Sequence, residues 1–370
     1  MKITVNKDDL LPALERAKRL VERRNTIPIL ANVKLEAVGD RLTITATDLD
    51  MQATATVPAD VTEAGEMTAP AHTLGDFVKK LPGGTVSITH DDKAATIRSG
   101  RSRATLHTLP TADFPDLACG DFSHTFEIGA DALARMMERV GFAISTEETR
   151  YYLNGIYMHR VTALGLPCLR MVATDGHRLA LDQVTAPDGS EGMPGIILPR
   201  KAVGEMEKLL APRKDGSARL EVSATKIRLT AGDTVFASKL IDGTFPDYGR
   251  VIPAGNGKRA DLDKAALAGA VDRVSTVSSE RGQAVKFSLG EGRLTLSVTN
   301  PDGGDAAEDL EADYASDPLE IGFNSRYVLD ILAAFPAAQV QVALNDAGSP
   351  ALFTIDGAPA PAFVLMPMRV

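Results

Sequence analysis

Residues 3–24 read ITVNKDDLLPALERAKRLVERR and contain two successive hydrophobic patterns. Ile3 and Val5 alternate with polar residues, which is the period of a half-buried β-strand. From Leu10 onward, apolar residues recur every three or four positions, which is the period of an amphipathic helix. The stretch therefore predicts a strand that leads directly into a helix.

The same strand-then-helix pattern returns twice further along the chain. Its second copy begins at Phe126-Glu-Ile128 and its third at Leu262. The apolar helix positions of the three copies are Leu10, Leu14, Ala17 and Val21, then Leu133, Met137 and Val140, then Leu267, Val271 and Val274. An acid–arginine pair occurs once in each copy, at Glu15-Arg16, Glu138-Arg139 and Asp272-Arg273. These regularities indicate an internal triplication.

A second helix recurs as well, within residues 70–81, 199–210 and 324–335. Strictly alternating stretches at 41–46, 220–223 and 293–298 predict strands around these helices, and Phe114-Pro-Asp116 and Phe245-Pro-Asp247 close two of the repeats. We expect an α+β chain of three similar domains, each with two helices packed on antiparallel sheets. The expected domains are residues 1–122, 123–253 and 254–370, with linkers near Cys119-Gly120 and at 252–257.

The composition is that of a globular protein without a membrane span. Hydrophobic residues make up 44% of the 370 residues and charged residues 24%, and no run approaches the ~18 apolar residues that a membrane helix needs. Cys119 and Cys168 are too few for a disulfide framework or a zinc site. The N-terminus does not resemble a signal peptide, so the sequence predicts a cytoplasmic protein.

The charge balance leaves two interpretations of the basic helices open. Forty basic and 49 acidic residues give a net charge of −9, which argues mildly against binding nucleic acid through one large patch. Residues 15–24 and 200–214 nevertheless each contain five basic and two acidic residues. A solvated helix face explains either segment alone, whereas two such helices at repeated positions favour a shared electropositive surface.

Groups that could carry catalysis are sparse in the sequence. There is no phosphate-binding glycine loop, no His-x-x-x-His pair and no Cys-x-x-Cys pair, so we expect neither a catalytic site, nor a metal, nor a cofactor. Asp175 and His177 could serve as an acid and a base of a hydrolase. The alternative, which we favour, is that Asp175-Gly176 forms a tight turn between two strands.

The C-terminal residues 362–370 are apolar almost to the chain end. A last core strand would explain them, but Met366 and Met368 flank Pro367, which does not donate to a β-ladder. Flexible methionine side chains suit a surface that accepts apolar partners, so we favour a peptide-binding groove.

Several motifs together resemble one family. Met1-Lys-Ile-Thr-Val5, Ile27-Pro-Ile-Leu30, Arg150-Tyr-Tyr-Leu-Asn-Gly155, Ala173-Thr-Asp-Gly-His-Arg-Leu179, Phe245-Pro-Asp-Tyr248 and Met366-Pro-Met-Arg369 resemble the bacterial sliding clamps, the beta subunits of DNA polymerase III. The resemblance covers essentially the whole chain. It implies the DNA clamp fold and a head-to-tail homodimer that closes into a ring around duplex DNA. A basic lumen with an acidic exterior would reconcile this function with the net charge.

The resemblance also implies three sets of functional residues. DNA contacts carry over to Arg24, Arg150, Tyr151, Tyr152 and Lys201. The dimer seam carries over to Ala104 and Leu106 in the first domain and to Thr276 and Val277 in the third. The partner-peptide groove carries over to Leu153, Thr174, Gly176, His177, Arg178, Leu179, Pro246, Arg250, Val251, Asn324, Tyr327, Val364, Met366, Pro367, Met368 and Arg369. Gly249, Glu147, Ala104 and Val370 depart from the family's pattern and bear on DNA affinity and dimer strength.

Three hypotheses therefore stand, of which a non-enzymatic, DNA-encircling processivity clamp leads. Its implied partners are double-stranded DNA, a second copy of the chain, the replicative polymerase catalytic subunit, the clamp loader, translesion polymerases, mismatch-repair proteins and DNA ligase. The translesion polymerases, mismatch-repair proteins and DNA ligase would bind through short linear motifs. No membrane is implied, and the protein would associate with the nucleoid. The alternatives are a hydrolase that uses Asp175 and His177, and a protein-binding scaffold without a role on DNA.

Overall fold

The computed structural model describes residues 1–23, 26–91, 93–117, 120–211, 215–278, 284–301 and 303–369. The predicted DNA contact Arg24 lies outside these residues, as do Cys119 in the predicted linker and Val370 at the chain end.

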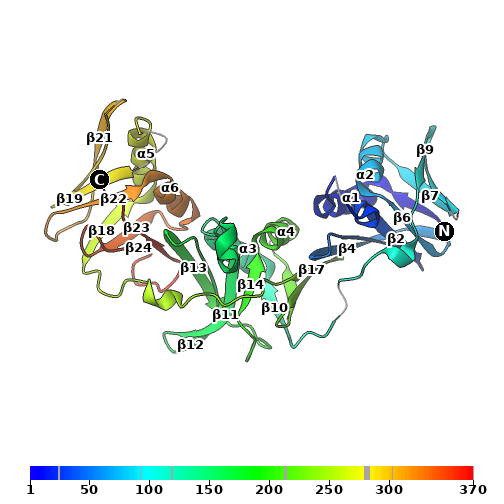
Figure 1. The fold of residues 1–370 in the computed structure, drawn as a ribbon, viewed down its shortest axis with the longest axis horizontal. Coiled ribbons are helices and arrows are strands. Elements are labelled where there is room, and N and C mark those ends of the chain that lie inside the picture. The colour runs from blue at the N-terminus through cyan, green and yellow to red at the C-terminus, as the bar shows by residue number, and fades with distance from the viewer. Residues whose placement is uncertain are drawn as a thin grey trace. The chain divides into compact units, whose positions relative to one another are not determined.

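Each α-helix in the described parts of the chain follows directly on a strand (Figure 1). The helices are α1 (Lys7–Leu20), α2 (Ala71–Lys80), α3 (Ala130–Gly141), α4 (Arg200–Leu210), α5 (Lys264–Ser275) and α6 (Ser325–Ala334). The strands before them are β1 (Lys2–Asn6), β6 (Gly65–Pro70), β10 (His124–Gly129), β14 (Ile196–Pro199), β18 (Lys258–Asp263) and β22 (Leu319–Asn324). The triplicated strand-then-helix pattern is confirmed, with two helices in each repeat.

Helix α1 shows how the sequence fixes these elements. Asn6 caps its N-terminus, because the Asn6 Oδ1 accepts a hydrogen bond of 3.0 Å from the backbone N–H of Asp8. Leu10, Leu14 and Ala17 are buried, as their spacing predicts, and form the face that packs on the sheet and on α2. The helix ends at Leu20, so Val21 is a buried residue just beyond it.

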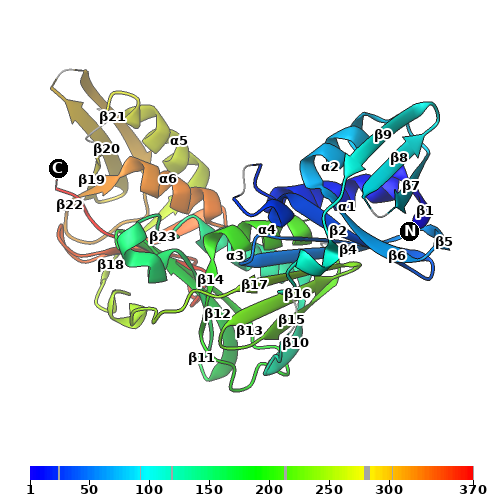
Figure 2. The ribbon, with the colours of Figure 1, turned by 45° about the vertical axis from the view of Figure 1, so that its right-hand side comes forward.

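The chain forms two compact units, of which unit 1 comprises residues 1–131 and 208–240. Its five-stranded sheet has the order β5-β1-β7-β8-β9, and its eight-stranded sheet has the order β10-β15-β16-β17-β4-β3-β2-β6. In Figure 2, β7, β8 and β9 run side by side to the edge of the first sheet. The further strands are β2 (Asn32–Val38), β3 (Arg41–Thr47), β4 (Met51–Pro58), β5 (Asp60–Glu63), β7 (Thr85–Asp91), β8 (Ala94–Ser99), β9 (Ser102–His107), β15 (Ser217–Val222), β16 (Lys226–Ala231) and β17 (Thr234–Lys239).

Unit 2 comprises residues 132–207 and 241–370. Its eight-stranded sheet has the order β14-β11-β12-β13-β25-β24-β23-β18, and its four-stranded sheet has the order β21-β20-β19-β22. The further strands are β11 (Gly155–Ala163), β12 (Leu166–Thr174), β13 (Arg178–Thr185), β19 (Ala284–Gly290), β20 (Arg293–Asn300), β21 (Gly304–Glu311), β23 (Gln339–Leu344), β24 (Ala351–Thr354) and β25 (Ala362–Leu365). Short 3₁₀ helices η1 (Pro28–Ala31), η2 (Thr111–Asp113), η3 (Glu148–Leu153) and η4 (Tyr248–Arg250) lie in the connections of the two units.

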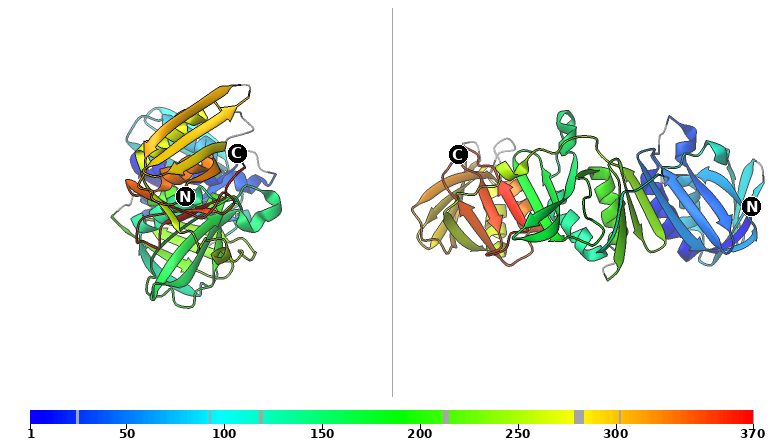
Figure 3. Two further views of the ribbon diagram at one scale, coloured as in Figure 1. Left: turned by 90° about the vertical axis from the view of Figure 1, so that its left-hand side faces the viewer. Right: turned by 90° about the horizontal axis from the view of Figure 1, so that it is seen from below.

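The two eight-stranded sheets join strands from neighbouring repeats. In unit 1, β17 pairs with β4, and Phe236 lies opposite Ala53. In unit 2, β13 pairs with β25, and Ala180 lies opposite Phe363. Figure 3 shows the orange and red strands of the C-terminal repeat beside the green strands of the middle repeat. The middle repeat is therefore shared between the two compact units. The domain boundaries expected at 122/123 and 253/254 stay a prediction.

Candidate functional site

The turn between β12 and β13 is held by the side chains of its own residues. The Thr174 hydroxyl donates to the Arg178 carbonyl at 2.7 Å, and the Asp175 Oδ1 accepts from the backbone N–H groups of His177 and Arg178 at 2.9 and 3.0 Å. Gly176 has φ +91°, and a Cβ there would lie 2.6 Å from an Arg150 nitrogen. The positive φ favours glycine, a Cβ would displace the end of the Arg150 side chain, and the predicted tight turn is confirmed.

The corresponding turn of the first repeat is built in the same way. The Thr47 hydroxyl donates to the Met51 carbonyl at 2.8 Å, and the Asp48 Oδ1 accepts from the N–H groups of Asp50 and Met51. Leu49, at φ 77°, takes the place of the glycine. Because Asp48 performs this structural task without a histidine, the shared aspartate needs no catalytic explanation. The Asp175 Oδ2 accepts from Arg178, so both oxygens of the proposed acid are occupied by the turn.

Beside this turn lies a mainly apolar cavity of about 300 Å³, which we call the groove. Its floor includes Leu179 of β13 and Val364 of β25, and Met366 and Val251 stand at its rim with 39% and 48% of their surface exposed. The groove brings together many residues of the predicted peptide site, namely Leu153, Thr174, Gly176, Arg178, Leu179, Pro246, Val251, Val364 and Met366. Its shape and lining suit one or two apolar side chains of an extended ligand.

The remaining predicted groove residues are distributed differently. His177, Asn324 and Tyr327 line an adjoining, more polar cleft of about 430 Å³, and Arg178 lines both cavities. Arg250, Pro367, Met368 and Arg369 line neither of the two.

Arg178 lies between the two cavities, and hydrogen bonds hold its side chain in place. Its Nε donates to Asp175 at 3.0 Å, one terminal nitrogen donates to Asp330 of α6 at 2.6 Å, and the other donates to the Phe142 carbonyl at 2.8 Å. The guanidinium also stacks over the Tyr327 ring, with its carbon 4.2 Å from the ring centroid. Arg178 thus holds the end of α3, β13 and α6 together and gives the groove a fixed wall.

The C-terminal segment contains both a core strand and exposed methionine side chains. Residues 362–365 form the fully buried strand β25 between β13 and β24, as a last core strand requires. Met366 and Met368 follow it with exposed side chains, while their N–H groups donate to the carbonyls of His177 and Gly322 at 2.9 and 2.8 Å. The backbone is therefore fixed while the methionine side chains stay available.

Two residues predicted to contact DNA, Arg150 and Tyr152, line the groove. Arg150 pairs with Glu147 at 2.7 Å and donates to the Asp175 carbonyl at 2.9 Å. The hydrogen bond from Arg150 holds the pKa of Glu147 below its ordinary value, so this acid stays charged beside the turn. Tyr151 has 54% of its surface exposed, and Lys201 is an exposed residue of α4.

Asp247 and Tyr248 also line the groove, although the sequence did not predict them as groove residues. The Tyr248 hydroxyl is within 2.9 Å of the His159 Nε2 and accepts from Arg170 at 3.2 Å. His159 stacks on Tyr157, which stacks on Phe245, with ring centroids 4.4 and 4.9 Å apart. Burial, aided by the charge of Arg170, lowers the pKa of His159 to about 4. The Phe245–Tyr248 motif could have signalled this wall, since its aromatic residues need partners on the sheet.

The predicted seam residues lie at two sheet borders of opposite charge. Ala104 and Leu106 belong to β9, an edge strand, and Arg98, Arg101 and Arg103 are exposed on or beside it. Arg98 lies opposite Arg103, and like charges directly opposite each other destabilise a strand pair. In unit 2, Thr276 and Val277 follow α5, and the edge strand β21 carries Asp305, Glu308, Asp309 and Glu311.

No helix in the described residues is long and apolar enough to cross a membrane. Within the same residues, no group of three or more His, Cys, Asp or Glu side chains is arranged to hold a metal ion.

Comparisons with known proteins agree with one another over the whole chain. Residues 1–118, 127–247 and 249–369 match the family models of the N-terminal, central and C-terminal domains of the DNA polymerase III beta subunit. The chain is 46% identical to the beta sliding clamp of Caulobacter vibrioides and 35% identical to that of Escherichia coli, each over the full length of both proteins. It is also similar, over the full length of both chains, to the solved sliding clamp of Bartonella birtlesii bound to griselimycin (48% identity, TM-score 0.96). The solved clamp of Caulobacter crescentus with polyethylene glycol bound to a putative beta-motif tethering region is similar to the same extent (46% identity, TM-score 0.96).

Proposed function

This chain belongs to the family of bacterial DNA polymerase III beta subunits, the sliding clamps, and from that membership we propose how its residues carry out the family's function. The protein is a replication processivity factor and not an enzyme: it encircles duplex DNA and tethers the polymerase. A ring needs no sequence readout, because weak, screened contacts with phosphate let it slide while topology retains it. A tethered polymerase gains a high effective concentration at the primer end.

The groove is the proposed docking site for the short linear motifs of partner proteins. The observation that carries this assignment is the convergence of Leu179, Val364 and Met366 in one apolar cavity beside the rigid turn at Gly176. The adjoining cleft at His177, Asn324 and Tyr327 extends the site, and Arg250, Pro367, Met368 and Arg369 border it in the proposal. Polymerase catalytic subunit, clamp loader, translesion polymerases, mismatch-repair proteins and DNA ligase would compete for this one groove.

Duplex DNA is the proposed partner of Arg24, Arg150, Tyr151, Tyr152 and Lys201. Since Arg150 and Tyr152 also line the groove, they would couple DNA contact to peptide docking. Replacing Lys201 by glutamate tests the DNA role, because Lys201 is an exposed residue that lines neither the groove nor the adjoining cleft. Residence on nicked circular DNA at moderate salt should shorten, while affinity for a motif peptide should not change. Unaltered residence would remove Lys201 from the DNA surface.

Self-association is proposed to join β9 of one copy to β21 of the next. In the described parts of the chain each of these strands lies at the edge of its sheet, and the arginines beside β9 complement the carboxylates of β21. Glu308 and Asp309 of β21 also pair with Arg273 and Arg293 of the same chain. Leu106 and Ala104 on one side and Thr276 and Val277 on the other would fill the seam. A head-to-tail contact of this kind forms a closed ring when the rotation that relates one copy to the next returns to the first copy.

Light scattering tests this seam. The protein should have a mass near twice 39.3 kDa, and Arg98→Glu with Arg103→Glu should shift it toward the monomer. Arg41→Glu, an exposed charge reversal on β3 in the other sheet of unit 1, is the matched control and should leave the mass unchanged. If the protein with both Arg98→Glu and Arg103→Glu kept the dimer mass, the proposed contact between β9 and β21 would be refuted.

The three domains are proposed to span residues 1–122, 123–253 and 254–370, and the protein is proposed to act in the cytoplasm at the nucleoid.

A further inference from the structure

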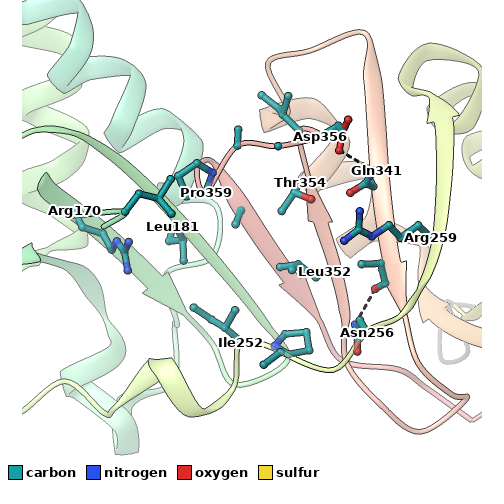
Figure 4. Close-up of a pocket in the computed structure, with 18 residues that line it drawn as sticks. Arg170, Leu181, Ile252, Asn256, Arg259, Gln341, Leu352, Thr354, Asp356 and Pro359 are labelled. Atoms are coloured by element: carbon teal, nitrogen blue, oxygen red, sulfur yellow. Dashed lines mark hydrogen bonds between the residues drawn. The ribbon is translucent and has the colours of Figure 1, made fainter. Parts of the chain in front are cut away.

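Figure 4 shows a second cavity, of about 540 Å³, in unit 2. It lies on the same face of the eight-stranded sheet as the groove, because the two cavities are lined by alternate residues of β13 and β25. We call this cavity the trough. Its floor is formed by Leu181 of β13, Ala362 of β25 and Leu352 of β24. The segment 252–256 borders one side and the loop 355–359 borders another. Asn256 fixes the first border, because its side-chain nitrogen donates to the carbonyls of Ala343 and Pro350 at 2.8 and 2.9 Å.

Two guanidinium groups line the trough without an acidic partner among the residues that the structure describes. Arg170 donates to the Gln183 Oε1 at 2.6 and 2.9 Å and to the Tyr248 hydroxyl, which are neutral acceptors. The Arg259 guanidinium makes no ion pair with any described residue, and Figure 4 shows the two arginines on opposite sides of the cavity. Among the lining residues, all of which the structure describes, Asp356 supplies the one carboxylate, and it accepts from Gln341 at 3.4 Å. The lining therefore holds two guanidinium groups and one carboxylate, while a second carboxylate, that of Asp261, accepts from the same Gln341 amide at 3.1 Å just outside the lining.

An exposed apolar lip adjoins this charge. Leu164 lines the trough at the tip of the β11–β12 hairpin with 82% of its surface exposed, and Leu166 beside it has 64% exposed. These two leucines present apolar surface that a bound ligand would cover. The apolar floor, the apolar lip and two arginines that make no ion pair with a described residue together fit an extended peptide that carries both apolar and acidic side chains.

The trough continues the groove along two shared strands. Leu179 and Val364 line the groove, whereas Leu181 and Ala362, two residues along the same strands and on the same face, line the trough. Two residues of a strand span about 7 Å. All four belong to one apolar cluster, against which Tyr248 and Ile252 of the intervening segment pack. A chain leaving the groove over Val251 reaches the trough within a few residues.

We infer that the trough receives the acidic, apolar flank of the same partner peptide whose short motif occupies the groove. This inference rests on the proposed function of the groove and adds a determinant of partner choice to it. Partners that share a motif but differ in the charge of their flanks would then differ in affinity.

The test uses fluorescence anisotropy with the full-length protein and four synthetic probes. One probe is a short peptide with two leucines for the groove. The second and third extend it by about six residues containing two glutamates and one leucine, at the N-terminal or the C-terminal end. The fourth carries glutamines in place of the glutamates at the end that binds better. We expect one glutamate probe to bind about fivefold more tightly than its glutamine counterpart at low salt.

The variants separate the trough from the groove. Arg259→Glu should abolish the glutamate advantage and leave the affinity of the short probe unchanged, and Arg259→Gln should give an intermediate result. Arg219→Glu, an exposed charge reversal in unit 1, is the matched control and should preserve the advantage.

Three results would overturn the inference. The first is an equal affinity for the better-binding glutamate probe and its glutamine counterpart. The second is a glutamate advantage that survives in Arg259→Glu. The third is a change of solution mass in that variant, which would assign the trough to a second copy of the chain. Failure of the short probe to bind would instead refute the groove and, with it, the flank that depends on it. The short probe thus distinguishes the two failures.

Discussion

Replacing Met366 by lysine is the sharpest perturbation of the groove. The Met366 side chain lines the cavity with 39% of its surface exposed, so the lysine can keep its ammonium group in water without disturbing the core. The backbone bond from the Met366 N–H to the His177 carbonyl is independent of the side chain and should persist.

The magnitude follows from the apolar contact that is lost. Burying a leucine side chain of the ligand is worth about 1.5–3 kcal/mol. Removing one apolar wall and placing a charge there should forfeit about 2 kcal/mol, or roughly a 30-fold rise in Kd. Met366→Ala, which loses the wall without adding a charge, should raise the Kd about fivefold.

The assay is fluorescence anisotropy with a labelled two-leucine peptide, accompanied by light scattering to show that self-association is intact. Val38→Lys is the matched control, because Val38 is an apolar residue of unit 1 with 62% of its surface exposed. The reasoning would be refuted if Met366→Lys bound the peptide as tightly as the unchanged protein. It would also be refuted if Val38→Lys lost affinity to the same extent.

Three further perturbations test the structure around the groove. Arg178→Ala should lower the free energy of unfolding by about 3 kcal/mol, because it leaves the Asp175 and Asp330 carboxylates without their partner; a thermal midpoint equal to that of the unchanged protein would contradict this. Gly155→Ala should cost about 2–3 kcal/mol in urea denaturation, since its Cβ would meet the Leu198 carbonyl oxygen, whereas Gly290→Ala, with nothing within 4 Å, should cost less than half of that. His159 has a lower pKa in the folded than in the unfolded protein, so its contribution to stability is complete above pH 6.5 and is lost as the pH falls toward 4. Its partial exposure limits this contribution to about 1.5 kcal/mol, and a His159→Gln protein with the same pH dependence of unfolding would rule it out.

The sequence predicts best the structural elements that repeat along the chain. Each helix of the triplication was marked by apolar residues at helical spacing, and Leu10, Leu14 and Ala17 are buried as expected. The Asp175-Gly176 turn was predictable because its chemistry is local: a side-chain acceptor and a glycine at positive φ determine it within four residues. The apolar C-terminal residues with Met366 and Met368 predicted a peptide-binding groove, and the family resemblance supplied its other residues and the ring, which no local pattern contains.

Features that depend on contacts distant in sequence were missed. Nothing near Phe236 or Phe363 in the chain indicates that β17 pairs with β4 or that β25 pairs with β13. The assignment of Arg150 to DNA alone overlooked its place in the groove, because the bond to the Asp175 carbonyl joins residues 25 positions apart. The opposite charges of β9 and β21 were visible in the sequence but acquire meaning only when both strands are known to be sheet edges.

Retention on DNA of different topology tests the central claim most directly. The protein would be loaded by a bacterial clamp loader with ATP onto a nicked circular plasmid, freed of unbound protein by gel filtration, and then followed after the plasmid is cut once. An encircling clamp should remain on the circle at a salt concentration that disrupts ordinary phosphate contacts and should leave once a free end is created. Equal retention on circular and linear DNA, or equal loss from both at that salt concentration, would contradict the encircling mechanism.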